Sequence, residues 1–252
     1  MNYLDSHCHI NDAAFKDDLA IVLDNMAKAD VKKALIVSSF IEDYQYAKTI
    51  KHPELSFKKS LGIYPDNVDE CNDETLAAYY QYFKEADCAA IGEIGLDYHW
   101  NNTNKERQQY FFDKQLSMAE ELGKPVIIHT RDAAQDTYDI LKRHHCQGVM
   151  HCFSEKREMA KLFLKLGYYL SFSGTITFKN AKEPPEVVKI TPLERLLVET
   201  DCPYMAPVPL RGKRNEPSFV VHTTRKAAEL LMMDEEELLR VINRNYDRLF
   251  GE

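Results

Sequence analysis

The chain has 252 residues, which is enough to bury one large core and is close to the roughly 250 residues typical of a closed α/β barrel. Its hydrophobic content of 44% and charged content of 29% are those of a soluble globular protein and exclude a disordered chain. A net charge of −8 argues against non-specific coating of nucleic acid, and the absence of a run of about 18 apolar residues argues against a membrane span.

The six cysteines are spread along the chain and form no Cys-x-x-Cys pair. A chain of this length does not depend on a disulfide framework, so we expect reduced thiols. The first residues lack a basic region followed by an apolar stretch, which is the pattern of a secretory signal. We therefore expect an unexported, cytoplasmic protein.

Short apolar runs alternate with segments of helical periodicity along the chain. The predicted strands are residues 3–10, 33–39, 55–63, 88–94, 126–129, 148–151, 168–171 and 195–199. The predicted helices are residues 17–29, 42–51, 73–86, 104–122, 132–144, 155–166 and 181–189, and two closing helices follow at 222–232 and 234–250. Asp73 is a candidate N-cap, and Gly123 is expected to end the longest helix.

This alternation predicts an α/β fold, a single (β/α)8 barrel of the TIM type with closing C-terminal helices, that takes up residues 1–252 as one domain. An open doubly wound sheet is the structural alternative. The connection at residues 202–218 is rich in Pro, Arg and Lys and is long enough for a lid or a substrate arm.

The first predicted strand ends in two histidines, His7 and His9, that are separated by one residue. Side chains alternate between the faces of an extended chain, so both imidazoles and Asp5 should point to one side. Neutral imidazole is a common metal ligand, although a lone His-x-His is more often a pair of partly exposed histidines.

Other predicted strands also end in imidazoles or carboxylates, and this is where such barrels place their catalytic groups. The strand-end residues are Glu93, His129, His151 and the run Glu199-Thr-Asp201. Four imidazoles with two or three carboxylates exceed the needs of one tetrahedral ion and predict two divalent ions about 3.5–4 Å apart.

A carboxylate can bridge two ions with its two oxygens, and Glu93 is the candidate for that bridge. We expect His7, His9 and Asp201 to hold one ion, and His129 and His151 to hold the other. Asp201 is also the candidate base that accepts a proton while metal-bound hydroxide attacks the substrate. Because this ligand count is filled without Asp5, that residue is expected to orient a ligand or to pack the barrel.

At this point the motifs resemble those of the TatD family of metal-dependent deoxyribonucleases, which belongs to the amidohydrolase superfamily. The resembling stretches are Asp5-Ser-His-Cys-His9, Gly92-Glu-Ile-Gly-Leu-Asp97, Pro125-Val-Ile-Ile-His-Thr-Arg-Asp-Ala133, His151-Cys-Phe-Ser154, Gly174-Thr-Ile-Thr-Phe178 and Glu199-Thr-Asp-Cys-Pro203. The resemblance implies a TIM-type barrel, the same six ligands, and a 3′–5′ exonuclease or related phosphodiesterase activity that includes dependence on magnesium.

Two positions depart from the family pattern. Relatives usually have histidine where Tyr64 follows Gly62-Ile63, and glycine where Glu155 follows Ser154. Neither position is a ligand of the family, so the metal site should be kept. The phenol of Tyr64 replaces an imidazole that would face the phosphate, which makes Tyr64 a candidate substrate-binding residue.

A phosphodiester needs cations besides the metal ions, because negative charge grows on its oxygens during attack. Arg131 is the first candidate, with a structural ion pair to Asp132 as its alternative. Arg211, Lys213 and Arg214 form a basic loop that resembles the family's, although a solvated charge run is the ordinary explanation. Trp100 is expected to stack on bases of single-stranded nucleic acid, with packing against the next helix as its alternative.

The predicted function is that of a divalent-metal-dependent hydrolase that cleaves phosphodiester bonds from 3′ ends of single-stranded DNA, with RNA as a further substrate. Asp201, Glu93 and Arg131 are the predicted catalytic residues, and zinc, manganese or magnesium are the candidate ions. One alternative keeps the site and changes the bond, as in an ester or amide hydrolase such as a deacylase acting on D-aminoacyl-tRNA. A remote alternative is a non-catalytic binding barrel, and a monomer is the working expectation for the oligomeric state.

Overall fold

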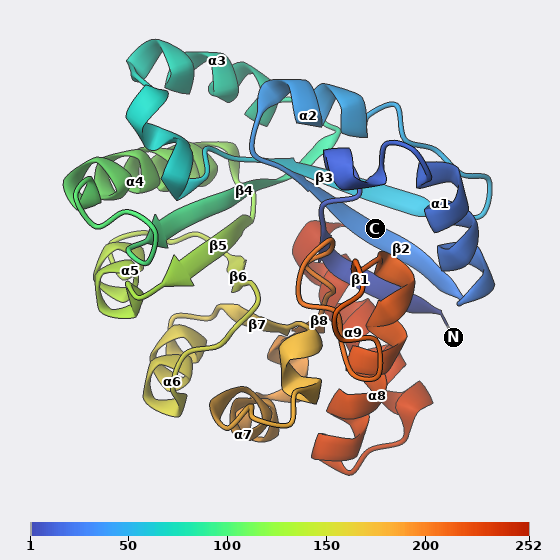
Figure 1. The fold of residues 1–252 in the computed structure, drawn as a ribbon. Coiled ribbons are helices and arrows are strands. Elements are labelled where there is room, and N and C mark those ends of the chain that lie inside the picture. Colours follow the sequence, from blue (N-terminus) through green and yellow to red (C-terminus); the bar gives the residue numbers. More distant parts are fainter. Residues whose placement is uncertain (1, 252) are drawn as a thin grey trace.

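Eight parallel strands form one sheet in this computed structural model of the protein, which describes residues 2–251. Each strand pairs with the next one along the chain, so the order in the sheet is that of the sequence. The strands are β1 (Tyr3–Cys8), β2 (Val31–Ser38), β3 (Ser56–Leu61), β4 (Cys88–Asp97), β5 (Val126–Arg131), β6 (Gly148–Met150), β7 (Tyr169–Phe172) and β8 (Leu196–Val198). The sheet curls into a nearly closed barrel with helices around its outside (Figure 1), which confirms the predicted TIM-type fold.

Helices follow the strands in regular alternation. They are α1 (Leu19–Lys28), α2 (Ile41–Ala47), α3 (Asp73–Phe83), α4 (Lys105–Leu122), α5 (Ala134–Leu141), α6 (Arg157–Lys165), α7 (Glu183–Ile190), α8 (Val220–Leu231) and α9 (Glu235–Phe250). Short 3-10 helices lie at η1 (Ala13–Phe15), η2 (Pro65–Glu70), η3 (Gly174–Thr177), η4 (Leu193–Arg195) and η5 (Pro217–Phe219). Across residues 2–251, no helix has both the length and the apolar character that crossing a bilayer requires.

Two helix ends test the predicted start and stop signals. The longest helix, α4, ends at Gly123 as predicted, because this residue takes the left-handed conformation with φ of 63°. The N-cap of α3 is Asn72 rather than Asp73, so that prediction is wrong by one residue. The Asn72 side chain accepts a hydrogen bond from the backbone N–H of Thr75, and the Thr75 hydroxyl accepts one from the backbone N–H of Asn72.

The barrel has an inner and an outer apolar layer. Inside it, strand residues such as Leu35, Val37 and Ile127 pack together and are fully buried. Helix α9 covers the end where the strands begin, because Lys33 at the start of β2 pairs with Asp247 at 2.6 Å. The Asn245 side chain also donates to the carbonyl oxygen of Leu196 in β8. The opposite end, where the strands finish, is left for a functional site.

Hydrogen bonds join β1 to the segment around β8 and so close the barrel. The Ser6 hydroxyl donates to the carbonyl oxygen of Val198 at 2.9 Å. The carboxylate of Asp5 accepts from the backbone N–H groups of Thr200 at 2.9 Å and His7 at 3.2 Å. The backbone N–H of Asp201 donates to the carbonyl oxygen of His7 at 3.0 Å. This seam therefore fixes His7 beside Asp201, and Asp5 orients the chain around both of them.

Candidate metal centre

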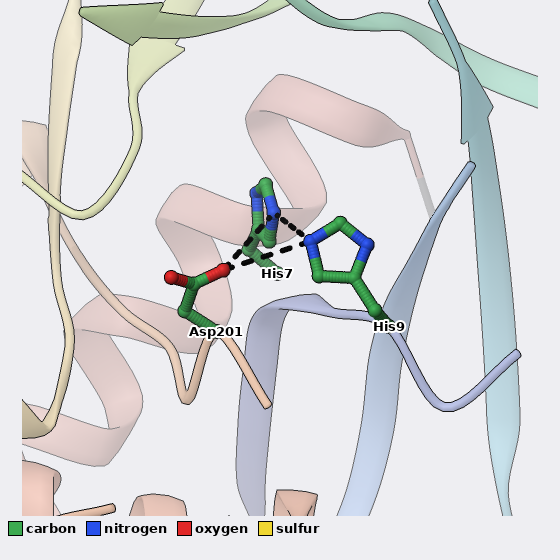
Figure 2. Close-up of side chains that lie close together, drawn as sticks. All are labelled: His7, His9 and Asp201. Carbon is green, nitrogen blue, oxygen red and sulfur yellow. Dashed lines mark hydrogen bonds and ion pairs between the residues drawn. The ribbon is translucent and has the colours of Figure 1, made fainter. Parts of the chain in front are cut away.

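Three side chains from the two sides of the seam meet at the end of the barrel. His7 lies in β1, His9 follows it, and Asp201 follows β8 (Figure 2). The Nε2 atoms of the two imidazoles are 3.0 Å apart. Oδ1 of Asp201 lies 3.7 Å from Nε2 of His7 and 3.6 Å from Nε2 of His9. All three donor atoms face one point, as the alternation of side chains predicts for the histidines.

These separations fit a bound transition-metal ion. Zinc forms bonds of about 2.0–2.2 Å to imidazole nitrogen and carboxylate oxygen, so two ligand atoms of a tetrahedral site lie about 3.3–3.6 Å apart. The observed distances among His7, His9 and Asp201 run from 3.0 to 3.7 Å. The chemistry and the spacing of this donor set therefore suit a divalent ion.

Glu93 on β4 connects this group to two further histidines. Its Oε1 lies 2.8 Å from Nδ1 of His129 on β5 and 2.7 Å from Nε2 of His151, which follows β6. Its Oε2 lies 3.5 Å from His7 and 3.7 Å from His9. His7, Glu93 and His151 also satisfy the spacing of a metal-binding group. The predicted ligands thus lie together, and we call the six residues the His–carboxylate cluster: His7, His9, Glu93, His129, His151 and Asp201.

Two further carboxylates hold the outer histidines in place. Oδ2 of Asp97 lies 3.0 Å from Nε2 of His129, and Oε1 of Glu199 lies 3.4 Å from Nδ1 of His151. Glu199 also accepts a hydrogen bond of 2.7 Å from the backbone N–H of Cys152. Carboxylates in this position fix the ring orientation of a ligating histidine and raise its basicity.

Glycines allow β4 to approach β5 closely enough to place Glu93 beside His129. Gly92 and Gly95 have φ values of 154° and 144°, which side chains disfavour. A Cβ atom on Gly95 would lie 2.0 Å from the carbonyl oxygen of His129, and one on Gly92 would lie 2.6 Å from Ile127. The two glycines around Glu93 are therefore required by close backbone packing.

Neighbouring groups and burial shift the pKa values of Glu93 and His7 within the cluster. Burial alone would raise the pKa of Glu93, but the charge of His151 and the hydrogen bonds from His129 and His151 hold the pKa well below its usual range. Burial and the nearby His151 lower the pKa of His7, which keeps its imidazole neutral. Glu93 is thus held in the ionised form and His7 in the neutral form, which are the states that bind metals.

The pKa of His151 moves the other way. Burial lowers it, but the charge of Glu93 and the hydrogen bond to Glu199 outweigh burial and raise the pKa well above its usual value. A histidine must lose this proton to become a ligand, so metal binding at the cluster should release protons.

All residues of the cluster except His7 line the floor of a pocket of about 540 Å³. The predicted substrate residues Tyr64, Trp100 and Arg131 line it. The Tyr64 hydroxyl lies 3.3 Å from Nε2 of His129, and burial together with the charge of Glu93 raises its pKa, so the phenol stays protonated. The Arg131 guanidinium lies 5.1 Å from the centre of the Trp100 ring. Its predicted alternative partner, Asp132, pairs instead with His99 at 2.9 Å.

The basic loop lies outside the pocket lining. The Arg214 guanidinium pairs with both oxygens of Asp18, at 2.9 and 2.6 Å, and lies 4.5 Å from the centre of the Phe15 ring. Arg211 stacks on Phe178 at 3.8 Å, and Lys213 is exposed. Arg214 therefore fastens the 202–218 connection to the body of the protein. Phosphate contact by Arg211 and Lys213 stays a prediction.

The structure adds residues that the sequence prediction missed. Asp97 supports His129 and lies four positions after Glu93, an even spacing that would place both on one face of an extended strand. Phe40, Tyr204 and Met205 also line the pocket, and all three are exposed. They lie in connections that carry no sequence periodicity, so no comparable signal marks them.

Glu155 and the cysteines are the remaining positions that the sequence analysis singled out. Glu155 lies between β6 and α6, where burial and the nearby charge of Asp132 raise its pKa. The cysteines of the chain are all free thiols, as predicted. Of those beside the cluster, Cys8 and Cys202 are buried in the outer apolar layer.

Comparison with known proteins identifies relatives along the whole chain. A family model described as TatD related DNase matches residues 4–251. An uncharacterized metal-dependent hydrolase of Bacillus subtilis, YabD, is 39% identical, with 98% of each chain covered. A second, YcfH of Escherichia coli, is 40% identical over 99% of this chain and 96% of its own. The crystal structure of YjjV, a TatD homologue from Escherichia coli, superimposes with a TM-score of 0.92 at 30% identity, with 99% of this chain and 98% of that chain covered.

Proposed function

The chain belongs to the TatD family of metal-dependent hydrolases, and from this premise we propose that it cleaves phosphodiester bonds at the 3′ ends of single-stranded DNA. RNA is a further substrate in this proposal. We propose that the protein is a cytoplasmic enzyme that acts as a monomer. Asp201, Glu93 and Arg131 are its catalytic residues.

The observation that carries the proposal is the position of Glu93. One of its carboxylate oxygens faces His129 and His151, and the other faces His7 and His9. Two divalent ions would therefore be held by Glu93 together with His129 and His151 on one side, and by Glu93 together with His7, His9 and Asp201 on the other. When bound, such ions supply a water of lowered pKa and polarise the phosphoryl oxygens.

The side chains of the pocket perform the remaining tasks. Asp201 faces the pocket with its carboxylate, and the hydrogen bond to His9 and the charges of His151 and His7 outweigh burial and lower its pKa. It is therefore ionised and accepts the proton of the attacking water. Arg131 and the protonated Tyr64 donate to the phosphoryl oxygens, where negative charge develops during attack.

The identity of the ions follows from the donor set. Four imidazoles favour zinc or manganese over magnesium, which prefers oxygen ligands and keeps its waters. Magnesium remains a candidate because two carboxylates belong to the cluster. We expect the strongest binding for zinc, and the assay should therefore compare zinc, manganese and magnesium.

A 3′-labelled single-stranded oligonucleotide tests the proposal directly. The metal-loaded protein should release labelled nucleotides, and EDTA should stop the release. A His7→Ala, Asp201→Asn double variant should lose at least about a thousandfold in kcat, because it removes two ligands and the base. The matched control is His145→Ala with Asp17→Asn, the same two substitutions at exposed positions outside the pocket. Unchanged cleavage in EDTA or by the first double variant would contradict the mechanism.

A second candidate function is favoured by the acidic part of the pocket wall. Asp12 and Asp43 line the pocket, and burial together with the charges of Glu42 and Asp12 raises the pKa of Asp43. Carboxylates in this position repel a phosphate but attract an ammonium group. D-aminoacyl-tRNA, the substrate of a deacylase, carries such an ammonium beside its ester bond. Release of amino acid from D-aminoacyl-tRNA, without cleavage of the oligonucleotide, would favour this activity.

A further inference from the structure

The mouth of the pocket carries large apolar side chains, although its floor consists of imidazoles and carboxylates. Ten large apolar side chains are exposed among residues 2–251, and four of them line this one pocket. They are Phe40, Trp100, Tyr204 and Met205, with exposed fractions of 47%, 69%, 60% and 40%. We call these four residues the apolar rim. Exposed apolar groups that gather in one place mark a binding surface, whereas scattered single ones need no explanation.

The rings of the rim are held in place by the strand ends below them. Phe40 lies between β2 and α2, Trp100 between β4 and α4, and Tyr204 between β8 and α8. The backbone N–H of Trp100 donates to Oδ1 of Asp97 at 3.4 Å, and that of Tyr204 donates to the carbonyl oxygen of Asp201 at 3.0 Å. Trp100 therefore follows by three residues the aspartate that supports His129, and Tyr204 follows by three residues an aspartate of the His–carboxylate cluster.

We propose that the apolar rim stacks on the unpaired base of the terminal nucleotide of single-stranded DNA, and so brings the adjoining phosphodiester bond to the His–carboxylate cluster. This inference rests on the proposed function and adds the feature that the enzyme recognises. Bases are flat rings that stack on aromatic side chains whatever their sequence. A base inside a duplex is already stacked and paired, and freeing it costs a few kcal/mol.

The charge of Arg131 and the size of the pocket agree with a nucleotide, although Asp12 and Asp43 on the pocket wall oppose a phosphate. The Arg131 guanidinium lies 5.1 Å from the centre of the Trp100 ring, so a positive charge stands where the phosphate of a stacked nucleotide would follow. The pocket of about 540 Å³ lies within the range of sites for small molecules. It therefore suits the end of a strand better than a length of double helix.

The chain offers a direct reporter of stacking, because Trp100 is its only tryptophan and belongs to the rim. The probes are a single-stranded oligonucleotide, the same strand with an abasic 3′-terminal nucleotide, and a blunt duplex. Phosphorothioate linkages at the 3′ ends slow hydrolysis, so that binding to the metal-loaded protein is measured. The intact single strand should quench the fluorescence of Trp100. The abasic strand and the duplex should bind about fivefold to a hundredfold more weakly.

Alanine variants locate the contact. Phe40→Ala and Tyr204→Ala should each weaken binding of the intact strand by about fivefold or more, and should reduce its advantage over the abasic strand. Tyr46→Ala is the matched control, because Tyr46 is an aromatic residue of α2 that is 42% exposed and lies outside the pocket lining. Circular dichroism of each variant reports whether it is folded, and Phe40→Leu or Tyr204→Leu replaces the alanine variant at the same position if that variant is not.

The outcomes separate this inference from the proposed function. Equal binding of intact and abasic strands, with Phe40→Ala and Tyr204→Ala both behaving like Tyr46→Ala, would overturn the rim proposal even if DNA is cleaved. Failure to cleave the unprotected oligonucleotide would overturn the proposed function. Discrimination between intact and abasic strands that the two rim variants abolish would support the rim as the site of base recognition.

Discussion

The floor and the mouth of the pocket are built in opposite ways. Glu93 at the floor is 3% exposed and lies within 4 Å of four imidazoles, whereas Trp100 at the mouth is 69% exposed. Groups that hold an ion must be fixed to a fraction of an ångström, and burial among charged partners provides this. Rings that receive a base need an open face instead. The difference indicates that the chemistry belongs to the floor and the choice of substrate belongs to the mouth.

The two regions are nevertheless connected at one residue. Asp97 is fully buried, and one of its oxygens lies 3.0 Å from His129. Its other oxygen accepts hydrogen bonds from the backbone N–H groups of His99 and Trp100. Glu199 supports His151 at 3.4 Å, but it also accepts a hydrogen bond from the backbone N–H of Cys152, which is not a residue of the rim. These two carboxylates therefore allow the separation of floor and rim to be tested.

The largest effect in this comparison is expected from neutralising these supports. Asp97→Asn and Glu199→Gln should each lower metal affinity or kcat by about 10- to 100-fold, because each removes the charge that orients and polarises a histidine. Only Asp97→Asn should also change the fluorescence of Trp100, since only Asp97 holds the turn that carries this ring. Zinc titration by calorimetry and emission spectra of both variants provide the measurements.

The result for Glu199→Gln is the control for that for Asp97→Asn. If both variants changed the tryptophan emission equally, the two regions would be coupled more widely than the hydrogen bonds indicate. If neither variant altered metal affinity or kcat, the assignment of His129 and His151 to the metal centre would be wrong.

An intermediate effect on kcat is expected from changing Tyr64, which lines the pocket between the floor and the rim. The Tyr64 hydroxyl faces His129 within the pocket, and burial with the charge of Glu93 keeps it protonated. Tyr64→Phe removes this donor and leaves the ring, so kcat should fall by about three- to tenfold. KM and the advantage of an intact over an abasic end should change by less than about twofold. Steady-state kinetics on both strands would show this, and an unchanged kcat would exclude Tyr64 as a donor to the phosphoryl group.

Much of the fold was accessible from the sequence because apolar periodicity reports burial. Eight strands and nine helices were predicted, and each has a counterpart in the part of the chain that the structure describes. His7, Glu93 and Asp201 were found because the ends of parallel strands meet at one edge. The strand predicted for 88–94 is longer than expected and runs as Cys88–Asp97, and for this reason Asp97 was overlooked.

The remaining features were not predicted because they depend on contacts between segments that lie far apart in the sequence. A run of charges indicates only that side chains reach solvent or a partner, and the partner of Arg214 is Asp18, 196 residues earlier. Tyr204 lies in the same connection and lines the pocket, although nothing in its neighbours distinguishes it. Such positions depend on how a loop folds back on the body of the protein, which local patterns do not encode.

The smallest effect is expected from breaking the ion pair between Arg214 and Asp18, which attaches the connection that carries Tyr204 and Met205 to the body of the protein. Arg214 holds the 202–218 connection to Asp18, and its hydrogen bonds lower the pKa of the Asp18 carboxyl. Since the pKa is lowered on folding, the pair contributes stability above the ordinary pKa of about 3.9 and loses it as the pH falls through the lowered value. The pair is exposed, so Asp18→Asn should lower Tm by less than about 4 °C near pH 7.

The rim should keep its affinity for the intact strand within about twofold in this variant, because the Tyr204 backbone is also held by Asn215 and Asp201. Calorimetry across pH should show the two proteins converging as the pH falls below the lowered pKa, where Asp18 is protonated in both states. A Tm difference that stays constant down to that pH would mean that the ion pair does not cause it. A large loss of affinity for the intact strand would show that the rim depends on the Arg214–Asp18 pair more than on the hydrogen bonds of the Tyr204 backbone to Asp201 and Asn215.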